Sequence, residues 1–162
     1  MKRFVIPAFV VLLLAAFGFW WFSPGQVIKR RTSSLLETLT FEAGSGRASR
    51  QMGVYSLNAL LAKEVELNTP TIEQANGTFE RSDIESAFTW LCQQAKQTSF
   101  EMGTIHSIEV KDDRAVIEFS LEALVELPTY RPADGAYRVT YEWIREENEW
   151  RLSRATWLEE NE

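Results

Sequence analysis

Hydrophobic and polar positions recur with two different periods along the chain. Between Gln26 and Ala95, apolar residues return at intervals of three, four and seven, which is typical of helices with one packed face. From Phe100 onward they alternate with polar residues, as in strands that bury one side. Helices followed by strands predict an α+β domain.

Three helices are expected in the first part. The first ends at Gly44-Ser45-Gly46, and the second lies between Ala48 and Ala62. A capping box, Ser82 to Glu85, predicts the start of the third. The residues expected to form their apolar faces are Ile28, Leu35, Leu36 and Leu39, then Met52, Tyr55, Ala59 and Leu60, and then Ile84, Phe88, Leu91 and Ala95. A short strand, 64–67, is expected before the third helix.

The last sixty residues predict four strands joined by short turns. One runs from Phe100 to Val110, one from Ile117 to Leu127, and two more carry Tyr137 to Trp143 and Trp150 to Trp157. Connections this short cannot make the crossover that parallel neighbours require, so these strands are predicted to be antiparallel.

The N-terminus carries a segment of a different kind. Nineteen residues without a charge, 4–22, form a stretch that as a helix spans about 28 Å, enough to cross a bilayer. The predicted anchor begins at Phe4 and ends in Trp20, Trp21 and Phe22, aromatic residues that favour the headgroup level. We therefore expect a short flank at 1–3, a transmembrane helix at 4–22 and one globular domain at 23–162. The short flank favours a domain on the extracytoplasmic side, periplasmic in a bacterium.

Charge and residue counts exclude several kinds of partner. After the hydrophobic segment the chain has 15 basic and 23 acidic residues, a net charge of −8, which would repel a phosphate backbone. Nucleic acid is therefore not expected as a partner. One cysteine, Cys92, and one histidine, His106, cannot form a disulfide or a zinc site of the usual kind, and no metal or cofactor is expected.

The order of elements resembles that of the nuclear transport factor 2-like superfamily. Two phrases add to the likeness: 76–79 (Asn-Gly-Thr-Phe) before the third helix, and 149–152 (Glu-Trp-Arg-Leu) in the last strand. The resemblance implies a cone in which a curved antiparallel sheet wraps three helices. That superfamily contains isomerases, dehydratases and polyketide cyclases as well as non-enzymatic binders and membrane-anchored scaffolds, so the fold alone does not choose a function.

Catalytic candidates are few. The aspartates fall at a helix start or in predicted turns, and the strand residues Glu118, Glu122 and Glu142 are predicted to form a solvated sheet face. Simple alternation from Phe100 places His106 on the side of Met102, toward the cone. In an enzyme, His106 would be the proton acceptor, with Tyr55 or Tyr137 as a polar partner.

The leading hypothesis is a membrane-tethered, non-catalytic domain that binds a protein partner or a small apolar ligand at the bilayer surface. The expected ligand pocket is lined by Tyr55, Phe88, His106, Phe119 and Tyr141. The alternatives are an isomerase or dehydratase that uses His106, and a subunit that forms a homodimer through its sheet.

Overall fold

The computed structural model describes residues 18, 21–70, 75–128 and 133–160. In this part the chain forms three helices and six strands. In chain order they are α2 (Pro24–Leu39), α3 (Arg47–Leu60), β1 (Leu61–Asn68), β2 (Gly77–Glu80), α4 (Arg81–Gln94), β3 (Gln97–Lys111), β4 (Arg114–Glu126), β5 (Ala133–Glu146) and β6 (Glu149–Glu159).

The six strands form one curved sheet in the order β2-β1-β6-β5-β4-β3. The four long strands β3 to β6 are antiparallel, as predicted, and the turns that join β3 to β4 and β5 to β6 contain residues with positive φ, Asp112, Glu147 and Asn148. β1 pairs antiparallel with β2 and parallel with β6, where Leu61 lies opposite Leu152. The parallel pairing was not predicted.

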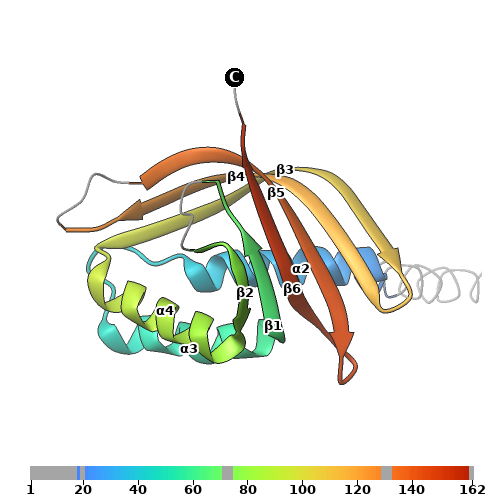
Figure 1. Cartoon of the computed structure of the whole chain (residues 1–162), viewed down its shortest axis with the longest axis horizontal. Coiled ribbons are helices and arrows are strands. Elements are labelled where there is room, and N and C mark those ends of the chain that lie inside the picture. The colour runs from blue at the N-terminus through green and yellow to red at the C-terminus, as the bar shows by residue number, and fades with distance from the viewer. Residues whose placement is uncertain (1–17, 19–20, 71–74, 129–132, 161–162) are drawn as a thin grey trace, which may run out of the picture.

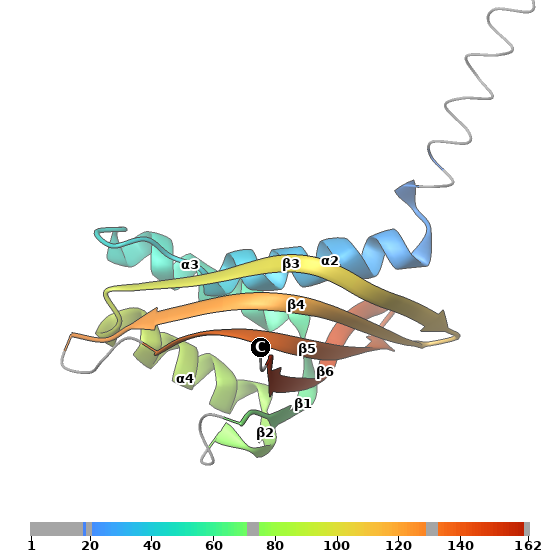
Figure 2. The same ribbon diagram turned by 90° about the horizontal axis from the view of Figure 1, so that it is seen from above.

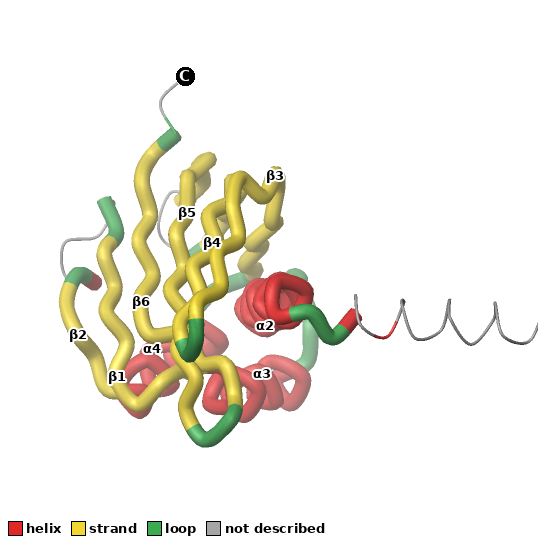
Figure 3. Tube along the Cα trace, turned by 90° about the vertical axis from the view of Figure 1, so that its right-hand side faces the viewer, coloured by secondary structure: helices red, strands yellow, loops and turns green. Residues whose placement is uncertain are grey.

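All three helices lie on one side of the sheet, in its concave face (Figure 3). α3 and α4 run side by side below the strands in Figure 1, and Figure 2 shows α2 running along β3. The predicted α+β architecture, with three helices packed against a curved sheet, is confirmed.

The core lies between the sheet and the three helices. α2 starts at Pro24, a residue suited to a first turn, and buries Ile28, Leu35 and Leu36, as its sequence pattern predicts. From the sheet side, the largest fully buried side chains are those of Trp143, Tyr141 and Phe119.

α3 turns a different face to the core from the one predicted. Leu57 and Leu60 are buried, whereas Met52 is 70% exposed and Tyr55 is 80% exposed. Close packing at Gly53 explains the orientation: a Cβ there would lie 3.2 Å from the carbonyl oxygen of Thr38 and 3.2 Å from the Phe88 ring. The side chains of Met52 and Tyr55 therefore lie outside the core.

The predicted capping box at α4 is absent. The helix begins at Arg81, its N-cap residue is Glu80, and no side chain caps it. Glu80 pairs with Glu64 as the last residue of β2, so strand pairing continues into the helix start. The Glu85 carboxylate instead accepts a hydrogen bond from the Asn58 side chain of α3.

The alternation of β3 is interrupted twice. Its register against β4 shifts between Met102 and Ile105, and again between Ile105 and Ser107. Each irregularity adds a residue to β3 that has no counterpart on β4, which changes the face that later residues occupy. The side expected for His106 was extrapolated through the first shift, and His106 itself lies within the second, so that expectation is wrong.

Most of the predicted anchor, including Phe4 and Trp20, lies outside the described residues. At its end, Trp21 and Phe22 are exposed, and an Arg30 Nη1 donates a hydrogen bond of 2.8 Å to the Trp21 carbonyl oxygen. Within the described part of the chain, no helix has both the length and the apolar character that a membrane crossing needs.

Candidate functional site

The inside of the cone, where a ligand pocket was expected, is packed with side chains. Phe88, Phe119 and Tyr141 are all buried in one hydrophobic cluster. The rings of Phe119 and Tyr141 meet edge to face, with centroids 5.2 Å apart. These three candidate pocket residues therefore belong to the core.

Tyr141 carries the one strongly shifted phenol of this interior. Burial raises its pKa above the ordinary value, and a hydrogen bond from the Trp157 side chain offsets part of the effect. The hydroxyl is therefore neutral at physiological pH.

His106 lies on the outward face of the sheet. It is exposed, and its Nε2 is 2.9 Å from the Oγ of Ser120, which alternates with the buried residues Phe119 and Leu121 on β4. The expectation that His106 points into the cone is overturned by the register shifts described above.

The two tyrosines considered as its partners lie elsewhere. Tyr55 is exposed on α3, whereas Tyr137 is partly buried on the inner face of β5, with its ring 5.4 Å from that of Trp157. The structure thus brings none of Tyr55, Tyr137 and His106 together.

No carboxylate, imidazole, amine or guanidinium side chain is fully buried in the described part of the interior. Among the described residues, the buried side chains are apolar or aromatic, with Thr32 and Thr98 as the polar exceptions. Two glutamates of the outer sheet face are paired there: Glu118 with Arg138 at 3.1 Å, and Glu142 with Arg154 at 2.9 Å. The prediction of a solvated charged face is confirmed for these two residues.

A large surface groove lies between α2 and α3, and no sequence pattern indicated it. Its volume is about 820 Å³, and most of its wall comes from small residues and hydroxyls. Its lining residues are Ser34, Glu37, Thr38, Thr40, Phe41, Glu42, Ser45, Ser49, Arg50, Met52, Gly53, Ser56, Ala59 and Leu60. We call this hollow the α2–α3 groove.

Arg50 lies in the α2–α3 groove, but its guanidinium is fully engaged. Its carbon lies 4.3 Å from the centroid of the Phe41 ring. All five donors that a guanidinium offers have acceptors within the protein. The acceptors are the Oγ of Ser45 and the carbonyl oxygens of Glu42, Cys92, Ala95 and Lys96, at 2.8 to 3.3 Å. Arg50 therefore ties α3 to the end of α4 and has no donor left for a ligand.

The neighbouring thiol belongs to the same contact. Cys92 is buried, as expected, and its Sγ lies 3.7 Å from the carbonyl oxygen of Arg50. Burial raises the pKa of the thiol, while the charge of Arg50 acts in the opposite direction. Within the described part of the chain, no three His, Cys, Asp or Glu side chains are grouped so that they could hold a metal ion.

Proteins similar to this chain were found by comparison of structures and not by comparison of sequences. No family model matches the sequence, and neither does any curated protein. A nuclear transport factor 2-like protein from Cytophaga hutchinsonii is 15% identical, with a TM-score of 0.64, over 85% of this chain and 98% of that one. A nuclear transport factor 2-like superfamily protein from Salmonella enterica is 12% identical, with a TM-score of 0.63, over 85% and 92%.

A third structure has been provisionally named a dehydratase. It comes from Streptomyces avermitilis and the same fold family, is 10% identical, has a TM-score of 0.59, and is matched over 85% of this chain and 96% of that one. At such low sequence identity, these similarities establish the arrangement of helices and strands but not an activity. They show that this chain has the nuclear transport factor 2-like fold.

Proposed function

We propose that the chain is a non-catalytic binding domain for a protein partner, held at a membrane surface by its N-terminal segment. The observation that carries the proposal is the filled interior of the cone. Aromatic side chains occupy the place where an enzyme of this fold would hold substrate, and the described interior contains no carboxylate or imidazole to move a proton. Binding at the outer surface is the function compatible with such a core.

The membrane attachment rests on the sequence. Residues 4–22 are uncharged and long enough to cross a bilayer, and the described end of this segment exposes Trp21 and Phe22. Arg30 lies over the Trp21 ring, 4.7 Å from its centroid, so a cation and an aromatic ring lie together where the domain begins. Such a pair suits the headgroup region, where anionic groups and apolar tails meet.

The alternative is an enzyme of isomerase or dehydratase type that uses His106. The provisional name of the Streptomyces avermitilis neighbour supports it. The place of His106 counts against it, because the imidazole is exposed and bonded to Ser120 on the far side of the sheet from the core.

Crosslinking in intact cells tests the binding proposal. A lysine-reactive crosslinker applied to cells that make the full chain should trap it with the same partner protein in repeated preparations. Recovery of the monomer alone would contradict a binding function. A crosslinked pair of identical chains would instead favour the homodimer.

The tether is tested separately by substitution of Leu13 with arginine. A charge at the centre of a membrane helix costs about 3 kcal/mol on insertion scales. The unsubstituted chain should stay with membranes in alkaline carbonate, and the Leu13→Arg chain should be released. Leu13→Ala is the control and should remain bound. Release of the unsubstituted chain would remove the tether from the proposal.

A further inference from the structure

We infer that the α2–α3 groove is the docking site for an amphipathic helix of a partner protein, one that carries Lys or Arg beside its apolar face. This inference names the surface and the kind of partner for the proposed binding function, on which it rests. Three properties of the α2–α3 groove support it: its length, the chemistry of its walls and its charge.

The length fits a helix. On the α3 side the lining runs from Ser49 to Leu60, which at the rise of an α-helix is roughly 16 Å, or three turns. A guest helix of that length places side chains at positions i, i+4 and i+7 along one face. The volume of about 820 Å³ also lies in the range of ligand-binding sites in proteins.

Several hydroxyl groups of the walls are already used within the protein. Thr38 donates to the Ser34 carbonyl oxygen at 2.7 Å, and Thr40 donates to that of Leu36 at 2.9 Å. Ser45 donates to the Glu42 carbonyl oxygen at 2.7 Å. With these donors spent on the backbone, the hydroxyls leave mainly their carbon atoms and acceptor lone pairs facing the α2–α3 groove.

An apolar contact region is exposed beside these walls. Met52 is 70% exposed at the rim, and Ala59 is exposed next to the buried Leu60. Methionine is common on surfaces that bind helices, because its flexible side chain adapts to different partners. The missing Cβ of Gly53 brings α3 against Thr38 and leaves the wall smooth at its centre.

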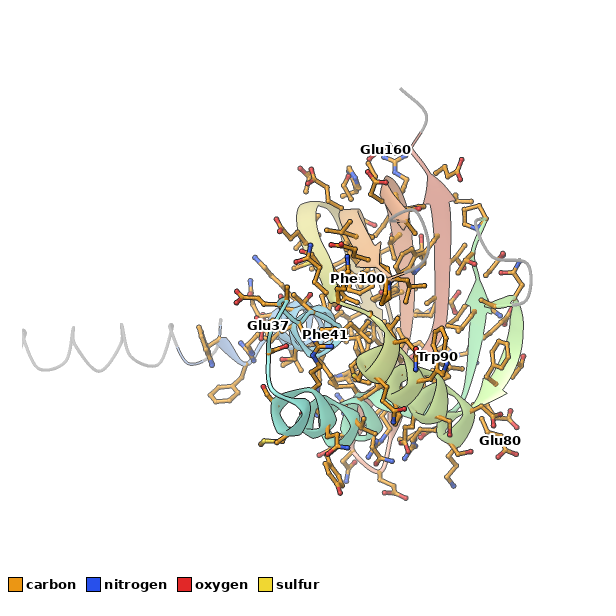
Figure 4. All side chains as sticks on the ribbon, turned by 90° about the vertical axis from the view of Figure 1, so that its left-hand side faces the viewer. Glu37, Phe41, Glu80, Trp90, Phe100 and Glu160 are labelled. Atoms are coloured by element: carbon orange, nitrogen blue, oxygen red, sulfur yellow. The ribbon has the colours of Figure 1, made fainter. Side chains whose placement is uncertain are left out.

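The charge of the α2–α3 groove selects a basic guest. Glu37 and Glu42 are exposed on its lining, and neither carboxylate forms an ion pair within the described part of the chain. Arg50 does not neutralise them fully, because it sits at the carboxyl end of α4, where the helix dipole opposes its charge. Figure 4 shows Glu37 and Phe41 at the same end of the domain.

The same features argue against a small anion. Since all five Arg50 donors have protein acceptors, phosphate or a carboxylate would have to displace existing bonds. A second hollow of about 420 Å³ shares Glu37 and Thr40 with the α2–α3 groove and continues past α2 to Phe100 and Met102. It extends the surface available to a basic side chain at the edge of the guest.

The test places a photo-crosslinking residue at the rim. The full chain is made in intact cells with p-benzoylphenylalanine at Met52, and separately at Trp90, an exposed residue of α4 that does not line the α2–α3 groove. The crosslinked partner peptide is then sequenced. We expect Met52 to trap a segment with apolar residues at helical spacing and Lys or Arg beside them, and Trp90 to trap it at least about tenfold less.

Charge reversal completes the test. Glu37→Lys combined with Glu42→Lys should lower the Met52 crosslink about tenfold, because like charges disfavour docking, and exchange of the partner's basic residues for Glu should restore it. Glu37→Gln with Glu42→Gln is a second variant that does not add charge and should give a smaller loss. Both variants should unfold at the same temperature as the unsubstituted chain, since neither carboxylate has an ion-pair partner among the described residues.

Other outcomes would overturn the inference. A Met52 crosslink to a second copy of the chain, or to a segment without basic residues, removes the stated partner. Crosslinks from Trp90 alone leave the binding function in place but move the site to another surface. The absence of crosslinks from both positions contradicts the α2–α3 groove, and the lysine-reactive experiment then decides whether the binding function falls with it.

Discussion

The Nε2 atom of His106 lies 2.9 Å from the Oγ of Ser120, and both side chains stand on the outward face of the sheet. This exposed pair resembles the nucleophile and base of a hydrolase only in its distance, because the described structure gives the imidazole no carboxylate partner. We expect His106→Gln to change the free energy of unfolding by no more than about 0.5 kcal/mol. Urea unfolding followed by tryptophan fluorescence measures this, and a loss above about 2 kcal/mol would mean that the histidine is needed for the fold.

Two buried threonines should respond oppositely to the same substitution. The Oγ1 of Thr32 is buried and finds no hydrogen-bond partner in the part of the chain that the structure describes, so Thr32→Val should stabilise the protein by about 1 kcal/mol. Thr98 donates to the Leu39 carbonyl oxygen at 2.6 Å, so Thr98→Val should destabilise it by about 1 to 2 kcal/mol. Urea midpoints of the two variants give the comparison. Equal shifts would show that the Thr32 hydroxyl is satisfied, for instance by water.

Arg50 should be the most sensitive charged residue of the helical layer. Arg50→Ala leaves the carbonyl oxygens of Cys92 and Ala95 without their donor and should cost about 3 kcal/mol. Arg50→Lys keeps the charge but not the planar set of donors and should recover less than half of that loss. The control is Arg138→Ala, which removes a surface ion pair with Glu118 and should cost less than about 1 kcal/mol. A similar cost for both alanine variants would contradict the role of Arg50.

Tyr141 should make the fold sensitive to alkali. Because burial raises the pKa of its phenol, the unfolded chain loses this proton first, and the folded state is disfavoured as pH rises above the ordinary tyrosine value of about 10. From this group, the free energy of unfolding falls by at most about 1.4 kcal/mol per pH unit above that pH. Below that pH it does not change the free energy of unfolding with pH. In Tyr141→Phe, the free energy of unfolding should fall less steeply between about pH 10 and pH 11 than in the unsubstituted protein.

The sequence predicts the layers of this fold well because long periodic segments dominate them. β4 alternates as expected, with Ile117, Phe119 and Leu121 buried, and the stripe of α2 is buried where its spacing predicts. The turns of the two long hairpins were also predicted from their polar residues, and the structure places residues with positive φ in both turns. In these elements local preference and burial agree.

The candidate site was predicted poorly, for reasons that can be located. The face of His106 depends on two register shifts, and Gly103 near the first of them is a weak signal that alternation stops there. The exposure of Tyr55 depends on a close contact made by Gly53, and helical spacing alone favoured the larger residues as the buried ones. The α2–α3 groove depends on how two helices cross, which no local pattern records.

The parallel pairing of β1 with β6 has a consequence for biosynthesis. Leu61 leaves the ribosome long before Leu152, so β1 has no neighbour on that side until the last strand has been made. Pairing across such a separation closes a long loop, a slow step in folding. Until then the apolar faces of the nascent helices stay open to water and to aggregation, which makes the emerging chain a candidate client for chaperones.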